Sequence, residues 1–342
     1  MKRKKILHVL ASNSFSGAEN VVCTIIENDN LYDMYYCSPK GTIEQALKER
    51  HINYIPLVKL TPNNIKKVCK ENNIDIIHAH DYKASFMSAI SGFKGKIISH
   101  IHCNYSFMKN WNIYTILYSL MSKKFYKIAV VSSAIINEAV FKNKIKNKCI
   151  IINNVVDSKK VKTKSLEDFN KKYDFIFIGR IIEEKNPILF IEIISELCKS
   201  NKSLKAAMIG SGTLESKCKE KILKLNINDN VDMLGFQDNP YKIIKNSKIV
   251  IMPSLIEGFG LTAIESMCLN KPVLNSGVGG LGTIFKNNPE FICNSKECYI
   301  KLSSYLIHNN EELKTYESKC KNIIAPYINI KVWKEKIYNL YK

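Results

Sequence analysis

Charged side chains that could bind a diphosphate follow a short apolar run in the second half of the chain. Gly179 and Arg180 come directly after residues 175–178, and Lys185 lies five positions beyond the arginine. An arginine and a lysine on one loop can both reach a diphosphate, and each charge-assisted hydrogen bond contributes roughly 1.5–3 kcal/mol. The same cations would stabilise the charge that develops on a departing diphosphate. The alternative is a solvated basic loop in a lysine-rich chain.

A second group combines glycines with two carboxylates where a predicted helix begins. The run Glu257-Gly258-Phe259-Gly260-Leu261 follows an apolar stretch, and Glu265 comes shortly after it. Gly258 and Gly260 let backbone amides at a helix N-terminus face an anion, and Glu257 could meet a sugar from the loop. Burying the Glu265 carboxylate among apolar residues costs several kcal/mol unless it is hydrogen-bonded. Ribose hydroxyls or a lysine would have to provide those hydrogen bonds.

Two further patterns are weaker. Gly210-Ser211-Gly212 follows another apolar run and predicts a tight turn that lets a ligand approach the backbone, although alone it favours a purely structural turn. No Asp-x-Asp occurs in the chain, so no metal platform for a diphosphate is evident. His78, His80 and Asp81 are a conceivable ligand set, but consecutive strand-end residues point to opposite faces. We therefore expect no bound metal.

The elements that position these residues alternate between β-branched runs and helical patterns, which is typical of βαβ units and parallel sheets. In the first half, strands are predicted at residues 6–11, 34–38, 54–58, 74–78, 96–102, 128–132 and 150–153, with helices at 65–72 and 113–125. In the second half, strands are predicted at 175–178, 206–209, 231–234, 249–252, 272–275 and 291–293, with helices at 187–199, 214–225, 261–268 and 311–320. Ligands of such folds bind at the carboxyl ends of the strands, where these motifs fall.

The length of 342 residues suits two α/β domains of about 150 residues each. We expect a first domain over residues 1–157, a charged linker over 158–172, a second domain over 173–325, and a C-terminal helix within 326–342 that packs back on the first domain. The predicted fold class is therefore α/β, with two Rossmann-like domains whose parallel sheets face one another across a cleft.

Composition narrows the class of protein. The net charge of +20 favours an anionic partner, such as a nucleic acid, an acidic membrane face or a phosphorylated ligand. The excess is larger in the first part, which holds 22 basic and 10 acidic residues up to Val155. Residues 6–10 are too short an apolar run for a signal peptide, no segment approaches the roughly 20 apolar residues of a bilayer span, and the eleven cysteines suggest reduced thiols. We expect a cytoplasmic protein, at most peripheral on the inner face of the cell membrane.

Aromatic residues interleave with lysines between positions 105 and 127. In helical register from Ile113 this stretch could present an amphipathic face to an anionic membrane or a lipid-linked acceptor. Aromatic residues at helical spacing are more often part of a core, and that alternative stays open. The aromatic residues are Tyr105, Phe107, Trp111, Tyr114, Tyr118, Phe125 and Tyr126.

Taken together, two glutamates eight residues apart around Gly-Phe-Gly, downstream of Gly-Arg and a lysine, resemble the retaining GT-B glycosyltransferases of family 4. The resemblance covers nearly the whole chain. Its other carriers are residues 16–19, which match a Gly-Gly-x-Glu loop, residues 76–80, 129–132 and 153–157, Pro272-Val273 and Gly279-Gly280.

The resemblance implies roles for individual residues. Arg180 and Lys185 would bind the diphosphate, Glu257 would contact the donor sugar and Glu265 the ribose. His102, at the end of a predicted strand, would position the sugar or support the developing charge. The donor-binding set also includes Gly17, Gly210, Gly258, Phe259, Gly260 and Leu261. No cofactor is implied, because the nucleoside-diphosphate sugar is a substrate.

Some positions depart from the family pattern. Ser16 replaces the first glycine of the N-terminal loop, which narrows access to the donor, and Asn154-Val155 replaces Asn-Gly. Thr283 stands where an acidic contact to the donor is common. None of these changes removes the charged residues of the motif.

The family transfers sugars with retention through an oxocarbenium-like transition state. Because both glutamates are committed to the donor, we favour a same-face substitution in which the leaving phosphate assists removal of the acceptor proton. The acceptor would be a glycan or a lipid-linked sugar, and by family habit the setting would be bacterial surface polysaccharide synthesis.

Three other readings remain. A same-fold sugar-nucleotide 2-epimerase would bind the same donor without an acceptor. A nucleic-acid-binding protein could use the +20 charge, but it predicts a concentrated basic stripe or a binding module, and neither is evident. A dinucleotide-dependent oxidoreductase is disfavoured because Gly-x-Gly-x-x-Gly does not follow the first strand.

Overall fold

The computed structural model describes residues 3–342 and contains two compact units. The first consists of residues 3–154 together with Ile330–Lys342, and the second of Val155–Asn329. Each unit is built on one parallel sheet flanked by helices. This confirms the predicted α/β fold with two Rossmann-like units.

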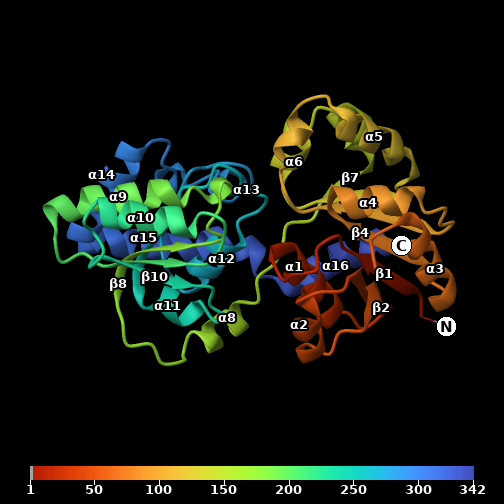
Figure 1. The fold of residues 1–342 in the computed structure, drawn as a ribbon, viewed down its shortest axis with the longest axis horizontal. Helices are drawn as coiled ribbons and strands as arrows, with labels where there is room; N and C mark the ends of the chain where they lie inside the picture. Colours follow the sequence, from red (N-terminus) through yellow and green to blue (C-terminus); the bar gives the residue numbers. More distant parts are fainter. Residues whose placement is uncertain (1–2) are drawn as a thin grey trace. The chain divides into compact units, whose positions relative to one another are not determined.

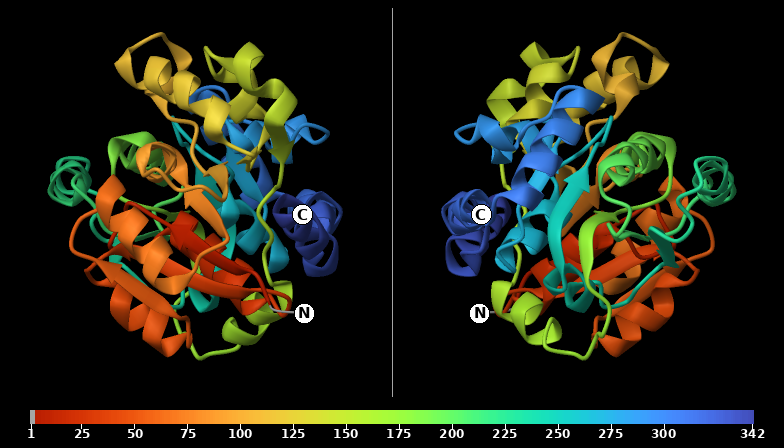
Figure 2. Two further views of the ribbon diagram at one scale, coloured as in Figure 1. Left: turned by 90° about the vertical axis from the view of Figure 1, so that its right-hand side faces the viewer. Right: turned by 90° about the vertical axis from the view of Figure 1, so that its left-hand side faces the viewer.

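The sheet of the first unit has seven strands in the order β3-β2-β1-β4-β5-β6-β7 (Figure 1). The strands are β1 (Lys5–Val9), β2 (Asp33–Pro39), β3 (Tyr54–Leu57), β4 (Ile76–His80), β5 (Lys96–Ile101), β6 (Lys127–Val130) and β7 (Cys149–Ile151). The helices are α1 (Gly17–Glu27), α2 (Ile43–Glu49), α3 (Pro62–Asn72), α4 (Asp81–Ile90), α5 (Ile113–Met121), α6 (Ser133–Glu138), α7 (Lys142–Ile145) and α16 (Ile330–Tyr341). Figure 2 shows the red and orange strands of this sheet side by side.

Local sequence explains where several elements begin and end. Helix α3 starts with Pro62 after Thr61, whose hydroxyl oxygen accepts a hydrogen bond from the Asn64 N–H at 3.3 Å. It ends at Asn73, which adopts the left-handed conformation with φ of 52°. All five residues of β4 are buried, as expected for a central strand of a parallel sheet covered on both faces.

Helix α16 belongs to the first unit although it is last in the sequence. Trp333, Ile337, Leu340 and Tyr341 are buried on its inner face. The Tyr341 hydroxyl lies 2.9 Å from Nδ1 of His78 on β4, and the Lys127 ammonium donates to the Asn339 carbonyl at 2.6 Å. The C-terminal residues thus complete the core beside the central strands, where Figure 1 also shows α16.

The sheet of the second unit has five strands in the order β10-β9-β8-β11-β12, all parallel. The strands are β8 (Tyr173–Ile178), β9 (Ala206–Ile209), β10 (Val231–Gly235), β11 (Ser247–Met252) and β12 (Val273–Asn275). The helices are α8 (Ser158–Lys164), α9 (Pro187–Ser200), α10 (Glu215–Lys224), α11 (Tyr241–Lys245), α12 (Leu261–Cys268), α13 (Gly280–Ile284), α14 (Lys296–His308) and α15 (Asn310–Ile324).

The expected linker was wrong in its first half. Residues 158–164 form α8, which Asp157 caps by accepting from the N–H groups of Lys159 and Lys160, each at 3.0 Å. Val161 is buried, and α8 packs against α11 and α12. A single buried apolar residue in a lysine-rich helix leaves too little periodicity to see in the sequence. The segment therefore belongs to the second unit.

Three other predictions need correction. The predicted strand at 291–293 is only one isolated bridge, between Ile292 and Asn275. The strand predicted at 74–78 lies two residues later, at 76–80. Helix α14 was missed, although Ser295 caps it by accepting from the Cys298 N–H at 3.2 Å. The aromatic stretch is split: Tyr118 and Phe125 are buried, whereas Trp111, Tyr114 and Tyr126 are exposed.

Candidate active site

Two loops that carry the predicted diphosphate motifs leave the same edge of the second sheet. Strands β8 and β11 are parallel neighbours, so their carboxyl ends lie side by side. The backbone N–H groups of Leu255 and Ile256, after β11, both donate to the Glu184 carbonyl, after β8, at 2.9 and 3.1 Å. Backbone hydrogen bonds therefore join the two motifs into one surface at the carboxyl ends of β8 and β11.

Lys185 and Glu257 form an ion pair within this surface. The Lys185 ammonium lies 2.6 Å from Oε2 of Glu257 and 3.5 Å from the Ile256 carbonyl oxygen. The side chains are 19% and 12% exposed, which makes the pair stronger than a fully solvated one. The sequence assigned the lysine to a diphosphate and the glutamate to a sugar, and the structure brings the two groups into direct contact.

Arg180 is exposed at the same strand end. Within residues 3–342 its guanidinium takes part in no hydrogen bond or ion pair, so its donors are available to an anion. It is one of three arginines in the chain. Its planar fork of N–H groups suits bidentate binding of a phosphate.

Glycines allow the loops at this edge to approach one another closely. A Cβ atom on Gly210 would lie 1.9 Å from the Gly179 carbonyl oxygen, and one on Gly279 would lie 2.0 Å from that of Glu257. Both residues also have positive φ, of 135° and 55°. Gly210, predicted to be part of a tight turn, thus holds the β9 loop against the residue before Arg180.

The remaining predicted donor-binding residues of the second unit surround the start of α12. Gly260, with φ of 102°, precedes the helix, and Leu261 is its first residue. Gly258 is buried, and the buried ring of Phe259 packs edge-on against Tyr327 with ring centres 5.5 Å apart. The backbone amides at the start of α12 follow this turn, and binding of an anion there stays a prediction.

Glu265 has a partner that the sequence did not suggest. Its Oε1 accepts a hydrogen bond from the Tyr241 hydroxyl of α11 at 3.0 Å. Within residues 3–342 no lysine forms an ion pair with it. Burial raises the pKa of the Glu265 carboxyl, and the Tyr241 hydrogen bond partly opposes that rise. Oε2 remains for a further donor such as a ribose hydroxyl.

In the first unit, Gly17 and His102 lie after the ends of β1 and β5. Gly17 is exposed and begins α1, where the Ser16 hydroxyl donates to the Glu19 carboxylate. His102 is 8% exposed, and its backbone N–H donates to Oδ1 of Asp81 at 2.9 Å. Asp81 itself has a φ of 64°, a strained conformation for a residue other than glycine.

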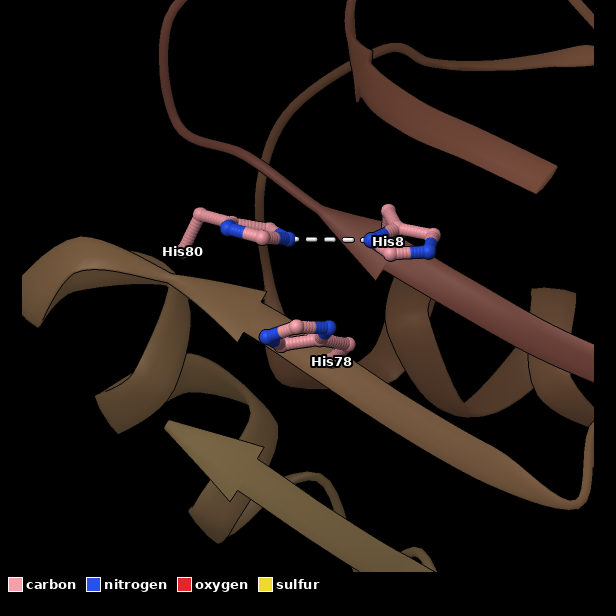
Figure 3. Close-up of side chains that lie close together, drawn as sticks. All are labelled: His8, His78 and His80. Atoms are coloured by element: carbon pink, nitrogen blue, oxygen red, sulfur yellow. Dashed lines mark hydrogen bonds between the residues drawn. The ribbon is translucent and has the colours of Figure 1, made fainter. Parts of the chain in front are cut away.

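His102 belongs to a group of five buried histidines, which we call the histidine cluster: His8, His78, His80, His100 and His102. Register explains the grouping, because His8 pairs with His78 across β1 and β4, and His80 pairs with His100 across β4 and β5. Hydrogen bonds join His8 Nδ1 to His80 Nε2 at 3.0 Å (Figure 3) and His80 Nδ1 to His102 Nε2 at 2.8 Å. His78 Nε2 lies 3.2 Å from His100 Nδ1.

Burial keeps these imidazoles neutral. It lowers the pKa of His8 to about 3 and that of His102 to about 4, and it moves those of the other three well below their ordinary value. Burial also raises the pKa of Asp81 to about 6. Neutral histidines can ligate a metal ion, and our argument from strand geometry against such a site was wrong. His78 and His80 are two residues apart and share one face of β4, whereas Asp81 already begins α4.

His8, His100 and Tyr241 escaped the sequence analysis. The only signal for His100 was alternation, since His100 and His102 are spaced by two residues, as are His78 and His80, and no such signal existed for His8. Such spacing places each pair on one sheet face. The missing information was the strand order that puts β1, β4 and β5 side by side.

Comparisons with known proteins identify the family and the fold. The family model for glycosyl transferases group 1 matches residues 158–323, and that for glycosyltransferase family 4 matches residues 32–160. An N-acetylgalactosaminyltransferase of Campylobacter jejuni, named for a diphospho-undecaprenol acceptor, is 26% identical over 94% of this chain and 95% of its own. The glycosyltransferase MJ1059 of Methanocaldococcus jannaschii is 34% identical, but the match covers only 48% of this chain and 44% of that protein.

The fold comparison covers both units. The Anabaena protein Alr3699/HepE, solved in complex with UDP, superposes with a TM-score of 0.85 over 98% of each chain, at 16% identity. At that identity the likeness shows the GT-B fold alone. Because the two family models together match residues 32–323 and the fold agrees, the chain belongs to the family 4, group 1 glycosyltransferases.

Proposed function

We propose that this enzyme transfers a sugar, with retention of anomeric configuration, from a nucleoside-diphosphate donor to a glycan or lipid-linked acceptor in bacterial surface polysaccharide synthesis. Arg180 binds the diphosphate as a free guanidinium. Lys185 lies between the diphosphate and Glu257, which contacts the donor sugar. Glu265 accepts from the ribose, and His102 contacts the transferred sugar.

One observation carries the proposal: the backbone and side-chain bonds that join the β8 and β11 loops. Glu184 accepts from two amides of the β11 loop, and the Lys185–Glu257 pair closes the same junction at 2.6 Å. This places a free arginine, a lysine and a carboxylate at one sheet edge beside the start of α12. Cations there stabilise a departing diphosphate as a divalent metal would, so the transfer needs no metal for that step.

Glu265 supports the nucleotide side of the proposal. Tyr241 occupies only one of its oxygens, and burial disfavours its charged form. A ribose supplies two hydroxyl donors that would stabilise the carboxylate. Because Glu257 and Glu265 are both committed to the donor, we favour same-face substitution with the leaving phosphate accepting the acceptor proton.

Helix α5 supports contact with an anionic bilayer. Ile113 and Leu120 are 61% and 50% exposed, and Tyr114 and Ile116 lie exposed beside them. Two exposed lysines, Lys123 and Lys124, follow the helix directly. An apolar face flanked by cations is the pattern of an interfacial helix. A hollow of about 580 Å³ beside Lys123 and Lys124 is lined by six lysines and one acidic residue, Asp75; the other four lysines are Lys4, Lys94, Lys96 and Lys148. Within residues 3–342, no helix is both long and apolar enough to cross a membrane.

The test is a thermal-shift screen of UDP-, GDP- and ADP-sugars against the parent, Arg180→Ala and Glu265→Ala. Ligand binding should raise the melting temperature of the parent by mass action and do so much less in the two variants. Lys217→Ala, an exposed change on α10, is the matched control and should keep the full shift. Equal shifts in all four proteins would reject the assigned site.

The reaction itself is followed with the best donor from that screen and lipid-linked acceptors. Retention predicts a product whose anomeric proton coupling matches that of the donor sugar. Conversion of the donor to a different sugar nucleotide without an acceptor would show an epimerase instead.

A further inference from the structure

Three members of the histidine cluster, His8, His80 and His102, form a continuous chain that we call the histidine relay. It runs from β1 through β4 to the residue after β5. The middle ring uses both of its nitrogens, Nε2 toward His8 at 3.0 Å and Nδ1 toward His102 at 2.8 Å. Figure 3 shows the rings of His8 and His80 pointing their nitrogens at one another. Nε2 of His8 and Nδ1 of His102 have no hydrogen-bond partner within residues 3–342.

Proton counting restricts this chain to two states. A neutral imidazole has one N–H donor and one lone pair, so His80 must donate to one neighbour and accept from the other. In the first state every N–H points toward His102, whose free Nδ1 then carries a proton. In the second state every N–H points toward His8, whose free Nε2 then carries a proton.

Accessibility to a ligand distinguishes the two states. Nε2 of His8 and Nδ1 of His102 are both buried and both lack a partner within residues 3–342, so without a ligand either state leaves one N–H unsatisfied. His8 is 0% exposed on β1, whereas His102 is 8% exposed just after the end of β5. A ligand oxygen that binds beside His102 would accept from Nδ1 and would therefore stabilise the first state.

We propose that the histidine relay holds His102 in the tautomer protonated on Nδ1, which donates to a hydroxyl oxygen of the transferred sugar. His80 is then a positioning residue, because it acts through His102, and His8 fixes the direction of the chain. The inference rests on the proposed function, because the bound donor is what favours the tautomer protonated on Nδ1.

A metal ion is the competing explanation for the cluster. Nitrogens of His8, His78 and His80, and likewise of His80, His100 and His102, lie within 4.8 Å of one another. Zinc binds imidazole nitrogens at about 2.0–2.1 Å, which requires three lone pairs to converge on one point. In the first of these groups the His8 and His80 nitrogens face each other, and His78 lies beside them (Figure 3). The paired arrangement favours hydrogen bonds, and the experiment decides between the two.

The experiment compares the full chain with His80→Asn and His80→Leu. An asparagine amide can still hydrogen-bond Nε2 of His102, whereas leucine fills similar space without a polar atom. Long-range ¹H–¹⁵N spectra of histidine-labelled protein, with His102→Gln for assignment, report which ring nitrogens carry protons. With the donor sugar nucleotide bound, the parent and His80→Asn should show His102 protonated on Nδ1 alone, and His80→Leu should show a mixture of tautomers.

Kinetics provide the second readout. His80→Leu should lower kcat about 10-fold or more with a smaller change in donor KM, because one aligned donor is worth about 10²–10³ in rate. The kcat of His80→Asn should stay within about 3-fold of the parent value, because the asparagine only weakens the hydrogen bond to His102 and does not remove it. A purely structural role would instead lower melting temperature and activity together, with no change in tautomer.

Several results would overturn the relay. These are a His102 protonated on Nε2 in the parent, equal loss in both variants, or stoichiometric transition metal in the purified parent that is lost in His80→Leu. If His80→Leu fails to fold, the parent spectrum and His80→Asn still decide. A parent with the expected tautomer but no transferase activity would reject the proposed function and leave the tautomer standing. Normal sugar transfer by a parent whose His102 shows mixed tautomers would reject the relay and leave the proposed function standing.

Discussion

The ammonium of Lys185 and the carboxylate of Glu257 lie 2.6 Å apart, although 72 residues separate them in sequence. Each belongs to a loop that begins where a strand of the same sheet ends. The pair is mostly shielded from solvent, so water and salt screen the attraction between the two charges less than they would on an open surface. A donor that binds here meets a lysine whose position is already set by the glutamate.

This pairing predicts strong coupling between the two side chains. Lys185→Gln and Glu257→Gln should each lower kcat/KM about 10²-fold or more, because under the proposed function each removes a charge-assisted contact to the donor. The double variant should lose less than the sum, with a coupling energy of about 0.5–3 kcal/mol. The more exposed pair Glu196 and Lys199, whose charged atoms lie 2.8 Å apart, is the matched control and should show negligible coupling. Additive losses at 185 and 257 would mean that the two residues act independently.

Glu265 should favour donor binding but lower the stability of the unliganded protein. Its pKa is raised by burial, so folding takes up a proton on this carboxyl, and the fold loses stability as the pH rises through that raised pKa. Glu265→Gln, which can still accept from Tyr241, should therefore melt higher than the parent at neutral pH. The difference should vanish below the ordinary value of 4.5.

The same variant should lose most of the melting shift that a sugar nucleotide produces, because a neutral amide binds ribose hydroxyls less strongly. Thermal melts from pH 4 to pH 8, with and without donor, measure both effects. For units of this size, about 1 kcal/mol corresponds to about 2–4 °C. A parent that outlasts Glu265→Gln at neutral pH without ligand would contradict this account.

Glycine substitutions separate backbone strain from steric collision. Gly210→Ala places a Cβ 1.9 Å from the Gly179 carbonyl oxygen at a φ of 135°, so the β9 loop must move away from Arg180. Gly235→Ala meets nothing within 4 Å at a φ of 66°, so it should cost only strain, about 1 kcal/mol. We expect Gly210→Ala to lower both stability and donor affinity, and Gly235→Ala to lower stability alone. Denaturant titration and donor binding give the comparison.

Membrane binding should depend on the exposed face of α5. Ile116→Ser with Leu120→Ser should reduce co-sedimentation with vesicles that contain anionic phosphatidylglycerol, because both side chains leave water on binding. Leu223→Ser, on the exposed surface of the second unit, should leave binding unchanged. Binding to neutral vesicles should be weaker and less sensitive to salt. Retained binding by the α5 variant would assign the contact to another surface.

The sequence was most informative where a motif with reactive or binding residues lies at the end of a strand or the start of a helix. Helix α12 was predicted with its observed bounds because Gly260 and the apolar spacing mark its start. The Arg180 and Glu257 loops could be placed at strand ends for the same reason. Helix α8 was mistaken for a linker because one buried valine does not produce a visible period.

What could not be predicted depends on contacts between distant segments. The Tyr241–Glu265 hydrogen bond joins residues 24 positions apart on different helices, and the bond between His8 and His80 joins residues 72 apart. These partners are fixed by sheet order and register, which local propensity does not encode. The roles of the individual site residues remain predictions that the experiments above decide.

The position of α16 has a consequence for biosynthesis. Leu340 and Tyr341 fill the core of the first unit, yet the ribosome makes them only after the whole of the second unit. The nascent first sheet must therefore wait with its flank uncovered while Val155–Asn329 emerges and folds. Removing the last few residues would leave His78 without its tyrosine partner and expose apolar strands, so short C-terminal deletions should cause aggregation rather than a mild loss of activity.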